Sequence, residues 1–266
     1  MVSVLRPGQR HISIPGIGVT TSRRAAGGAS NGLKNALIAY WKLDEASGDA
    51  LDAHTNALTL TATATAPGAD TGKVYSTARV SSYAATSYFR RSDETLLTTG
   101  DVDFTIAAWV YQTAKDSYNH IVSKATDSTP PYMQFLLRYQ GNVDRYRFEV
   151  AWGSFSYVPV DANNHGSPGL NTWTLIVAWH DAGNNKLCIS VNNGTVNEVS
   201  HSNGVSTVTS PLFFGRQHPA STLGWAGRFG PIAFWKSAAG GGGVLTTDQR
   251  TALYNAGAGL AYSAFS

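Results

Sequence analysis

Residues 170–200 read LNTWTLIVAWHDAGNNKLCISVNNGTVNEVS, and this stretch decides the fold class. From residue 173 to residue 180 the side chains divide into two faces with a period of two, which is the pattern of a β-strand. One face carries Trp173, Leu175, Val177 and Trp179, and the other carries Thr174, Ile176, Ala178 and His180. Alternation resumes over residues 186–191, where Leu187, Ile189 and Val191 share one side.

Two turn signals separate the strands of this stretch. Residues 181–185 read DAGNN, and these residue types tolerate left-handed backbone. Asn193-Gly194 is a strong hairpin signal, because an Asn-Gly pair accepts positive φ at low cost. The stretch is therefore predicted to form a three-stranded meander. A meander alone is only marginally stable, so we expect the remaining sequence to supply a second sheet.

The rest of the chain carries signals for further strands and one short helix. Strands are predicted over residues 37–43, 103–111, 132–139, 145–152, 211–215 and 230–235, with weaker signals over 56–90. Thr246-Thr-Asp-Gln249 has the form of a capping box, in which the threonine oxygen and the glutamine side chain each satisfy a backbone amide. It predicts a helix that carries Leu253 and Tyr254 and ends at Gly257.

Size and composition indicate one large folded domain. The chain has 266 residues, of which 42% are hydrophobic and 14% charged, so general disorder is excluded. No apolar run approaches the length of a membrane span, and the first residues show no continuous apolar segment of the secretory type. The single cysteine, Cys188, excludes an internal disulfide framework, and its strand position predicts a packed thiol.

Charge is distributed unevenly along the chain. Residues 1–35 hold five basic residues and no acidic one, whereas the whole chain has 20 basic and 17 acidic residues. We therefore predict an extended basic N-terminal arm over residues 1–35 and a folded domain over residues 36–266. Alternating isoleucines in the arm suit addition of a strand to the sheet edge of a partner, and a flexible leader is the alternative. The residues predicted to contact that partner are Arg6, Arg10, Ile12, Ile14, Arg23 and Arg24.

The order of these segments resembles the laminin G-like, concanavalin A-like lectin/glucanase jelly-roll family, over residues 36–262. The residues that carry the resemblance are YWKLDEASG at 40–48, DFTIAAW at 103–109, WTLIV at 173–177 with the Asn193-Gly194 hairpin, GWAG at 224–227, FWKS at 234–237 and LYNAG at 253–257. The resemblance implies an all-β, antiparallel two-sheet jelly-roll sandwich with a short C-terminal helix. Two segments depart from the family pattern: the glycine run 240–243 and residues 83–89, which replace a phenylalanine-aspartate-glycine motif.

Some relatives in this family cleave β-glucans with paired carboxylates. Retaining glycosidases place two carboxyl groups about 5–5.5 Å apart, and the E-x-D-x-x-E pattern that supplies them does not occur in this chain. Asp101 and Asp103 have the i, i+2 spacing, but they follow Gly100 at the start of a strand, where turn capping is expected. We therefore predict no catalytic residue and a non-enzymatic protein.

The sequence predicts no metal ligand set and no cofactor. The seven histidines lack the spacing of zinc ligands. No EF-hand loop is present, although the resemblance leaves calcium open as an alternative, because the family often binds it through scattered oxygens.

Aromatic residues beside glycines are the candidate glycan contacts. Trp152, Phe155 and Tyr157 surround Gly153, and Trp225 lies between Gly224 and Ala226. Such rings could stack on a sugar, and the alternative is that they belong to the core.

Three functions are compatible with these features. The first is a virion structural or decoration protein, of a bacteriophage, which is anchored through its arm to other virion or assembly proteins and displays the sandwich. The near absence of cysteine and the Thr-, Ser-, Ala- and Gly-rich strands favour it, and a homo-oligomer or larger assembly is then expected. The second is a lectin or adhesin, extracellular or on a cell surface, that binds glycans. The third is a glycoside hydrolase. Membranes and nucleic acid are not expected as partners.

Overall fold

The structure is a computed structural model that describes residues 30–63, 65, 67–83, 86–126, 132–154, 156–237 and 242–266. The described residues from Asn31 onward belong to a compact unit that spans Asn31–Ser266. The arm residues singled out in the sequence, Arg6, Arg10, Ile12, Ile14, Arg23 and Arg24, lie outside the described part, and so does Phe155. In the described part, no helix has the length and apolar character needed to cross a membrane.

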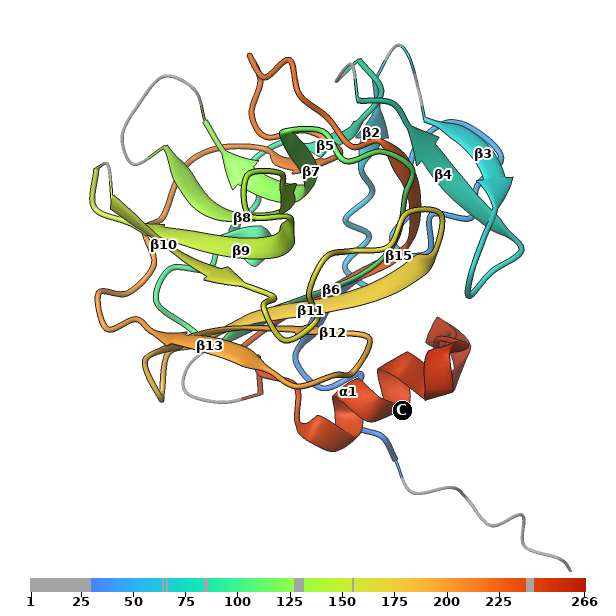
Figure 1. Cartoon of the computed structure of the whole chain (residues 1–266). Coiled ribbons are helices and arrows are strands. Elements are labelled where there is room, and N and C mark those ends of the chain that lie inside the picture. Colours follow the sequence, from blue (N-terminus) through green and yellow to red (C-terminus); the bar gives the residue numbers. More distant parts are fainter. Residues whose placement is uncertain are drawn as a thin grey trace, which may run out of the picture. The chain divides into compact units, whose positions relative to one another are not determined.

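The described unit is a sandwich of two antiparallel sheets, as predicted (Figure 1). In the described residues, eight strands form one sheet in the order β13 (Asn197–Ser200), β12 (Lys186–Val191), β11 (Trp173–Asp181), β6 (Phe104–Gln112), β15 (Gly227–Lys236), β4 (Thr77–Ser81) and β3 (Gly68–Thr71), with β1 (Leu37–Trp41) also paired to β15. Seven form the other: β10 (Ser156–Asp161), β9 (Arg145–Trp152), β8 (Met133–Gln140), β7 (Tyr118–Ala125), β14 (Leu212–Phe214), β5 (Phe89–Arg91) and β2 (Thr61–Ala62). The stretch 170–200 contributes three consecutive strands, so the predicted meander is confirmed.

The main core lies between the two sheets. From the eight-stranded sheet it receives Phe104, Ile106, Ala108 and Val110 of β6 and Ile176 and Ala178 of β11. The seven-stranded sheet contributes, among others, Phe135, Leu137, Phe148 and Val150. Each set follows the period of two read from the sequence, because alternate side chains of a strand point to one face.

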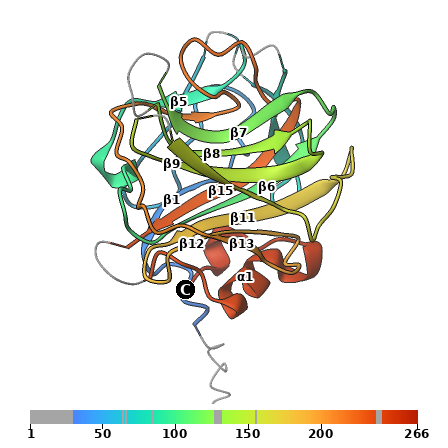
Figure 2. The same cartoon turned by 60° about the vertical axis from the view of Figure 1, so that its left-hand side comes forward.

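A second core covers the outer face of the eight-stranded sheet. Leu175, Val177 and Trp179, the other apolar set of β11, pack here with Trp109, Leu253 and their neighbours. Helix α1 (Thr247–Tyr254) lies on the side of β11 and β12 that faces away from β8 and β9 (Figures 1 and 2). Both faces of β11 are therefore buried, which explains why its sequence is apolar on both sides.

Helix α1 begins as predicted and ends earlier than predicted. Gln249 N donates to Thr246 Oγ1 (3.2 Å) and Thr246 N donates to Gln249 Oε1 (2.8 Å), so the capping box is confirmed. The left-handed residue that ends the helix is Asn255 (φ 49°), and Gly257 follows in the 3₁₀ turn η2 (Asn255–Gly257). The predicted end at Gly257 is wrong because asparagine also accepts this backbone conformation.

The hairpin turn after β12 is displaced by one residue from its predicted centre. Asn192 and Asn193 have φ of 51° and 55°, and Gly194 N donates to the carbonyl of Val191 (2.9 Å). These are the features of a type I′ turn centred on the Asn-Asn pair rather than on Asn193-Gly194.

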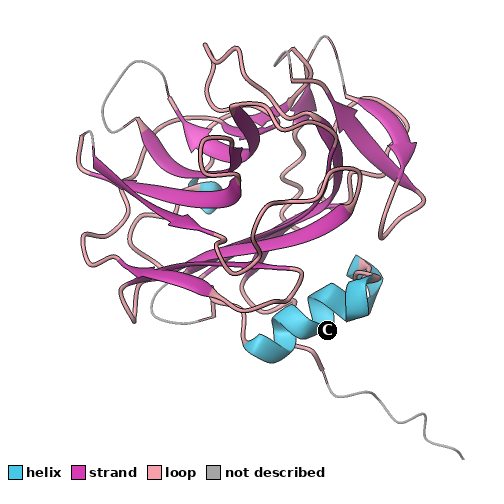
Figure 3. Ribbon diagram, viewed as in Figure 1, coloured by secondary structure: helices cyan, strands magenta, loops and turns pink. Residues whose placement is uncertain are grey.

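The two ends of the described unit are joined by hydrogen bonds. Asn31 N donates to Ser266 Oγ (2.9 Å), and Ser266 N donates to Asn31 Oδ1 (3.0 Å). Leu33 is fully buried in the second core, and Trp235 Nε1 donates to its carbonyl (2.8 Å). Residues 31–35, which the sequence placed with the arm, are thus attached to the sandwich. The strands and the helix are distinguished by colour in Figure 3.

Candidate functional site

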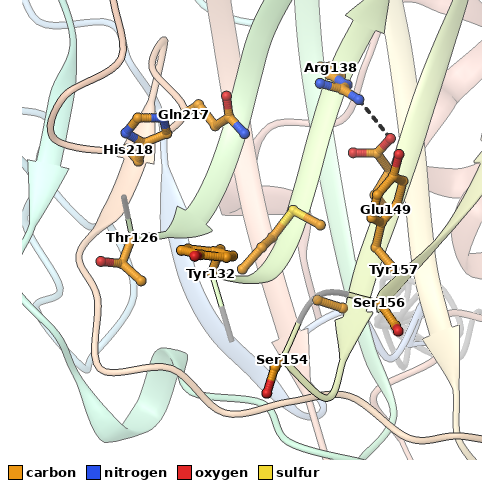
Figure 4. Close-up of a pocket in the computed structure, with 11 residues that line it drawn as sticks. Thr126, Tyr132, Arg138, Glu149, Ser154, Ser156, Tyr157, Gln217 and His218 are labelled. Atoms are coloured by element: carbon orange, nitrogen blue, oxygen red, sulfur yellow. Dashed lines mark hydrogen bonds and ion pairs between the residues drawn. The ribbon is translucent and has the colours of Figure 1, made fainter. Parts of the chain in front are cut away.

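A pocket of about 450 Å³ lies on the outer face of the seven-stranded sheet (Figure 4). Its lining comes from segments that are distant in sequence: Thr126, Tyr132, Met133, Arg138, Glu149, Ala151, Ser154, Ser156, Tyr157, Gln217 and His218. The volume falls within the range of about 300–1,000 Å³ that is usual for small-molecule sites. The pocket is therefore large enough to hold a small organic ligand.

The alternation of β9 determines which side chains reach this pocket. Tyr146, Phe148 and Val150 point into the main core, so Glu149 and Ala151 point outward. Ala151 packs outside the main core with Ala125, Met133 and Leu136, and together they form a small apolar cluster. On the neighbouring strand β10, Tyr157 pairs with Ala151. The pocket thus combines an apolar floor with polar side chains on the outward face of residues 145–152.

Charged side chains in and beside the pocket are paired with one another. Arg138 Nη2 donates to Glu149 Oε1 (2.7 Å), and Arg147 Nη1 lies 3.6 Å from the same oxygen. Arg147 also forms a bidentate pair with Asp161, at 2.6 and 2.8 Å. Bidentate arginine–carboxylate pairs are among the stronger and more specific hydrogen-bonded arrangements. Two arginines and two carboxylates therefore form a connected, charge-balanced group.

Burial changes the protonation behaviour of this region. Burial raises the pKa of Glu149, although Arg138 and Arg147 act in the opposite direction. Burial also lowers the pKa of His120, which pairs with Arg138 across β7 and β8, to about 3, with Arg138 and His218 contributing. The His120 ring is therefore neutral at ordinary pH. The residue next to Arg138 on β7 therefore adds no charge, and the positive charge of this group is carried by Arg138 and Arg147.

Two tyrosines form the exposed aromatic surface of the pocket. Tyr157 is 56% exposed and Tyr132 is 37% exposed. Both line the pocket, where Tyr132 lies across the hollow from Glu149 in Figure 4. Aromatic rings with an open face can pack against apolar parts of a ligand while the hydroxyl stays in water.

The structure separates the four aromatic residues proposed from sequence. Tyr157 lines the pocket, and Trp152 is half-buried at the end of β9, paired with Ser156 and outside the described lining. Phe155 lies outside the described residues. Trp225 is fully buried in the main core against Phe229, with ring centroids 5.8 Å apart. A stacking role for Trp225 does not fit this position, because neither face of its ring is open to a ligand.

Among the described lining residues the sequence singled out only Tyr157, and it missed, among others, Tyr132, Arg138, Glu149 and Gln217. Tyr132, Arg138 and Gln217 show no local motif, since the pocket forms only when separate segments meet. Glu149 had a signal, because it alternates with Phe148 and Val150 on a strand with one polar face. Its burial among arginines, rather than exposure to solvent, could not be read from that pattern.

The aspartates considered as catalysts lie away from the pocket. Ala182 N donates to Asp103 Oδ1 (2.9 Å), so Asp103 holds the turn between β11 and β12. Asp101 Oδ1 lies 3.8 Å from His180 Nε2 at the other side of the sandwich. Both contacts are structural, in agreement with the capping role expected from their place in the sequence.

Neither the cysteine nor the described acidic and histidine residues form a reactive or metal-binding group. Cys188 is buried in the second core, and burial raises the pKa of its thiol to about 12. It is a packed thiol, as predicted. Within the described ranges, no group of three or more His, Cys, Asp or Glu side chains is arranged to hold a metal ion.

Comparison with known proteins identifies the family. Residues 83–241 match the family model of the concanavalin A-like lectin/glucanases superfamily, and the chain belongs to this family. No curated protein sequence matches the chain significantly. The predicted jelly-roll fold and family resemblance are confirmed.

Solved structures with the same fold include sugar-binding and toxin domains. Domain 4 of AbnA, an extracellular arabinanase from Geobacillus stearothermophilus in complex with arabinotriose, has a TM-score of 0.59 at 16% identity, over 82% of this chain and 97% of that chain. The binding domain of Paraclostridial Mosquitocidal Protein 1 has a TM-score of 0.55 at 13% identity, over 76% and 48%. The botulinum neurotoxin serotype G binding domain has a TM-score of 0.51 at 11% identity, over 75% and 46%. The chain spans about half of each toxin structure, and these likenesses concern the fold.

Proposed function

We propose that this domain binds carbohydrate in the pocket on the seven-stranded sheet. The observation that carries the proposal is the meeting, in one hollow, of exposed tyrosine rings, an apolar floor and a fixed arginine–glutamate pair. Sugars present apolar C–H surfaces beside hydroxyl groups, so they need a flat ring and nearby donors and acceptors. Tyr157 and Tyr132 offer the rings, and Arg138 and Glu149 offer the donor and the acceptor.

The ion pair suits this role because it is already ordered. Arg138 is held by Glu149 at 2.7 Å and by the ring of Tyr118, whose centroid lies 4.9 Å from the guanidinium carbon. Side chains that are fixed before binding lose little conformational entropy when a ligand arrives. Hydroxyl groups of a sugar can then bond to the remaining guanidinium N–H groups and carboxylate lone pairs.

The carboxylate content of the pocket supports binding over hydrolysis. Hydrolysis by two carboxyl groups needs an acid and a second carboxylate flanking the glycosidic bond. Glu149 is the only carboxylate among the described lining residues, and Arg138 occupies one of its oxygens. Asp161, the nearest acid to this group, is held by Arg147. The fold itself is compatible with sugar binding, since the arabinanase domain of the same fold was solved with arabinotriose.

A glycan array with paired variants tests the proposal. Tyr157→Ala should abolish retention of any glycan that the wild-type protein binds, without changing its melting temperature by more than a few degrees. Leu51→Ala is the matched control, because Leu51 is 57% exposed and lies outside the described lining. A wild-type protein that is silent on broad arrays, with and without calcium, would refute carbohydrate binding as its function.

We infer a second role, which can coexist with the first, from the charge of the N-terminal segment. Residues 1–30 carry four basic residues and no acidic one, and the folded unit begins at Asn31. Such a segment suits docking on an acidic protein surface, and we propose that it anchors the domain to a virion, as in a bacteriophage decoration protein. The domain would then be displayed outward with its glycan pocket accessible. Loss of assembly on removal of the segment, described below, tests this role.

A further inference from the structure

A second hollow of about 390 Å³ lies beside the first on the same sheet. Its lining comes from the β6–β7 loop, the start of β7, the core-facing Tyr139 near the end of β8 and the β8–β9 turn, so this hollow lies at the end of the strand: Lys115, Asp116, Ser117, Tyr118, Tyr139, Gly141 and Asn142. The turn that forms one side is closely packed. A Cβ on Gly141 would lie 2.8 Å from the carbonyl oxygen of Asp116 and 2.9 Å from that of Ser117. Any larger residue would need a backbone shift there, so this side of the hollow is fixed.

One stacked pair of side chains joins the two hollows. Arg138 lines the first, and its guanidinium carbon lies 4.9 Å from the ring centroid of Tyr118, which lines the second. The two residues come from adjacent strands, β8 and β7, and Tyr118 pairs with Gln140. In Figure 4, Arg138 lies at the end of the first pocket away from Ser154, which is the end toward this junction. The hollows therefore meet across a shared wall.

Together the hollows follow the length of strand β8. Met133, its first residue, lines the first hollow, and Gly141, the residue after its end, lines the second. An eight-residue strand extends about 25 Å at roughly 3.3 Å per residue. Tyr118 contacts Arg138 and stacks on His120, with ring centroids 6.4 Å apart, and it is still 36% exposed, so it offers a third partly exposed ring at the end opposite Tyr157. We call this surface, formed by the two sets of lining residues, the β8 trough.

The arginine and lysine of the β8 trough are both matched by carboxylates. Arg138 pairs with Glu149 at 2.7 Å, and Lys115 Nζ lies 2.8 Å from Asp144 Oδ1. Hydrogen bonds from Lys115 and Ser167 hold the pKa of Asp144 down to about 2, so this carboxylate is ionised at ordinary pH. Asp116 adds a further acidic side chain to the lining. An acidic sugar would have to displace one of these carboxylates from its cation.

We propose that the β8 trough binds an extended stretch of an uncharged oligosaccharide, rather than a single terminal sugar or an acidic glycan. The inference rests on the proposed function and names its ligand class. Tyr157 and Tyr132 hold one part of the chain, and Tyr118 holds a later part. The Arg138–Glu149 pair lies between them. Because its two charges balance, it offers hydrogen bonds to sugar hydroxyl groups and no net charge to an acidic group.

Calorimetric titration with sugar series of increasing length tests this inference. The probes are cello-, manno- and xylo-oligosaccharides from disaccharide to hexasaccharide, with oligogalacturonates of the same lengths as the acidic arm. Wild-type affinity should rise with length in one neutral series and stay lower for the acidic one. Tyr118→Ala should weaken binding of the longest ligand about fivefold to tenfold and the disaccharide much less, because Glu149 still holds Arg138 at 2.7 Å. Tyr157→Ala should weaken both.

Matched variants separate the loss of the ring from other effects. Tyr118→Phe keeps the ring and should bind as the wild type does. Tyr111→Ala removes an equivalent stack, in which Arg228 lies 4.5 Å from the ring on the other sheet, and should change neither affinity.

The outcomes distinguish failure of the β8 trough from failure of carbohydrate binding itself. Three results would overturn the β8 trough and leave a pocket of single-sugar size. They are an affinity that does not depend on ligand length, wild-type affinity of a folded Tyr118→Ala variant for the longest ligand, and tighter binding of oligogalacturonates than of neutral sugars. Failure of the wild-type protein to bind any carbohydrate would overturn both.

Discussion

Replacing Trp109 with alanine removes an indole ring from the second core, between the eight-stranded sheet and the C-terminal segment. The ring is 4% exposed, stacks on Tyr254 with centroids 6.0 Å apart, and lies so close to Gly259 that a Cβ there would meet its Nε1 at 3.2 Å. Tryptophan-to-alanine changes in a well-packed core cost about 3–5 kcal/mol, from lost transfer free energy and the cavity left behind. The expected loss in the free energy of unfolding is in that range, because three different elements meet on this ring.

Denaturant unfolding measures the loss, and hydrogen exchange locates it. Trp173→Ala is the control, since Trp173 only borders the same core, and it should cost less, about 1–2 kcal/mol. Amides of α1 should lose protection in the Trp109 variant while those of β8 and β9, on the far sheet, keep theirs. A loss below about 1 kcal/mol, or equal loss of protection in both sheets, would show that this ring does not hold the C-terminal segment to the sandwich.

Three further predictions follow from the charged groups and the N-terminal segment. Burial raises the pKa of Glu149 above its unfolded value of about 4.5. The contribution of this group to the free energy of unfolding is therefore complete below about pH 4.5 and is lost as pH rises through the folded pKa. The difference in stability between wild type and Glu149→Gln should fall as pH rises from about 4.5, and a rise would mean that Arg138 and Arg147 outweigh burial. Lys124 is fully buried and is bonded to Asp93 and to the carbonyl of Ser210. Asp93→Ala removes its carboxylate partner and should lower the free energy of unfolding, measured with denaturant, by about 2–3 kcal/mol. A change below about 0.5 kcal/mol would show that the carbonyl of Ser210 alone is enough to stabilise the buried lysine. Deleting residues 1–29 should leave the melting temperature unchanged and abolish incorporation into particles; normal incorporation would refute anchoring through this segment.

The sequence contained enough information for the sandwich because strand burial is a local, periodic property. Phe104, Ile106, Ala108 and Val110 alternate in the sequence and do share the main core. The sequence did not reveal what covers the other face of β11. Leu175, Val177 and Trp179 on that face pack against residues from the far end of the chain, and no local pattern indicates this contact. The capping box at Thr246 placed the helix, but only the packing shows which sheet it covers.

The pocket was much less predictable than the fold. It depends on which outward side chains of β8, β9, β10 and the loop after β14 meet, and no periodicity encodes that meeting. Trp225 illustrates the difficulty: the glycine before it suggested an open loop, but Gly224 forms a bridge with Arg216 and the ring turns into the core. Tyr157 was found because it stands near Gly153 in a cluster of aromatic residues, although no strand was predicted over residues 156–161.

The hydrogen bonds between Asn31 and Ser266 place the two ends of the folded unit side by side. A short peptide could replace these hydrogen bonds covalently and join the two ends, so that the chain could be reopened at an exposed turn elsewhere without rearranging either sheet. Equally, the whole sandwich could be spliced into a surface loop of another protein, since a host would have to bring only two neighbouring residues together. A tensile load applied across the two ends would first part the exposed hydrogen bonds between Asn31 and Ser266 and would then reach the strands.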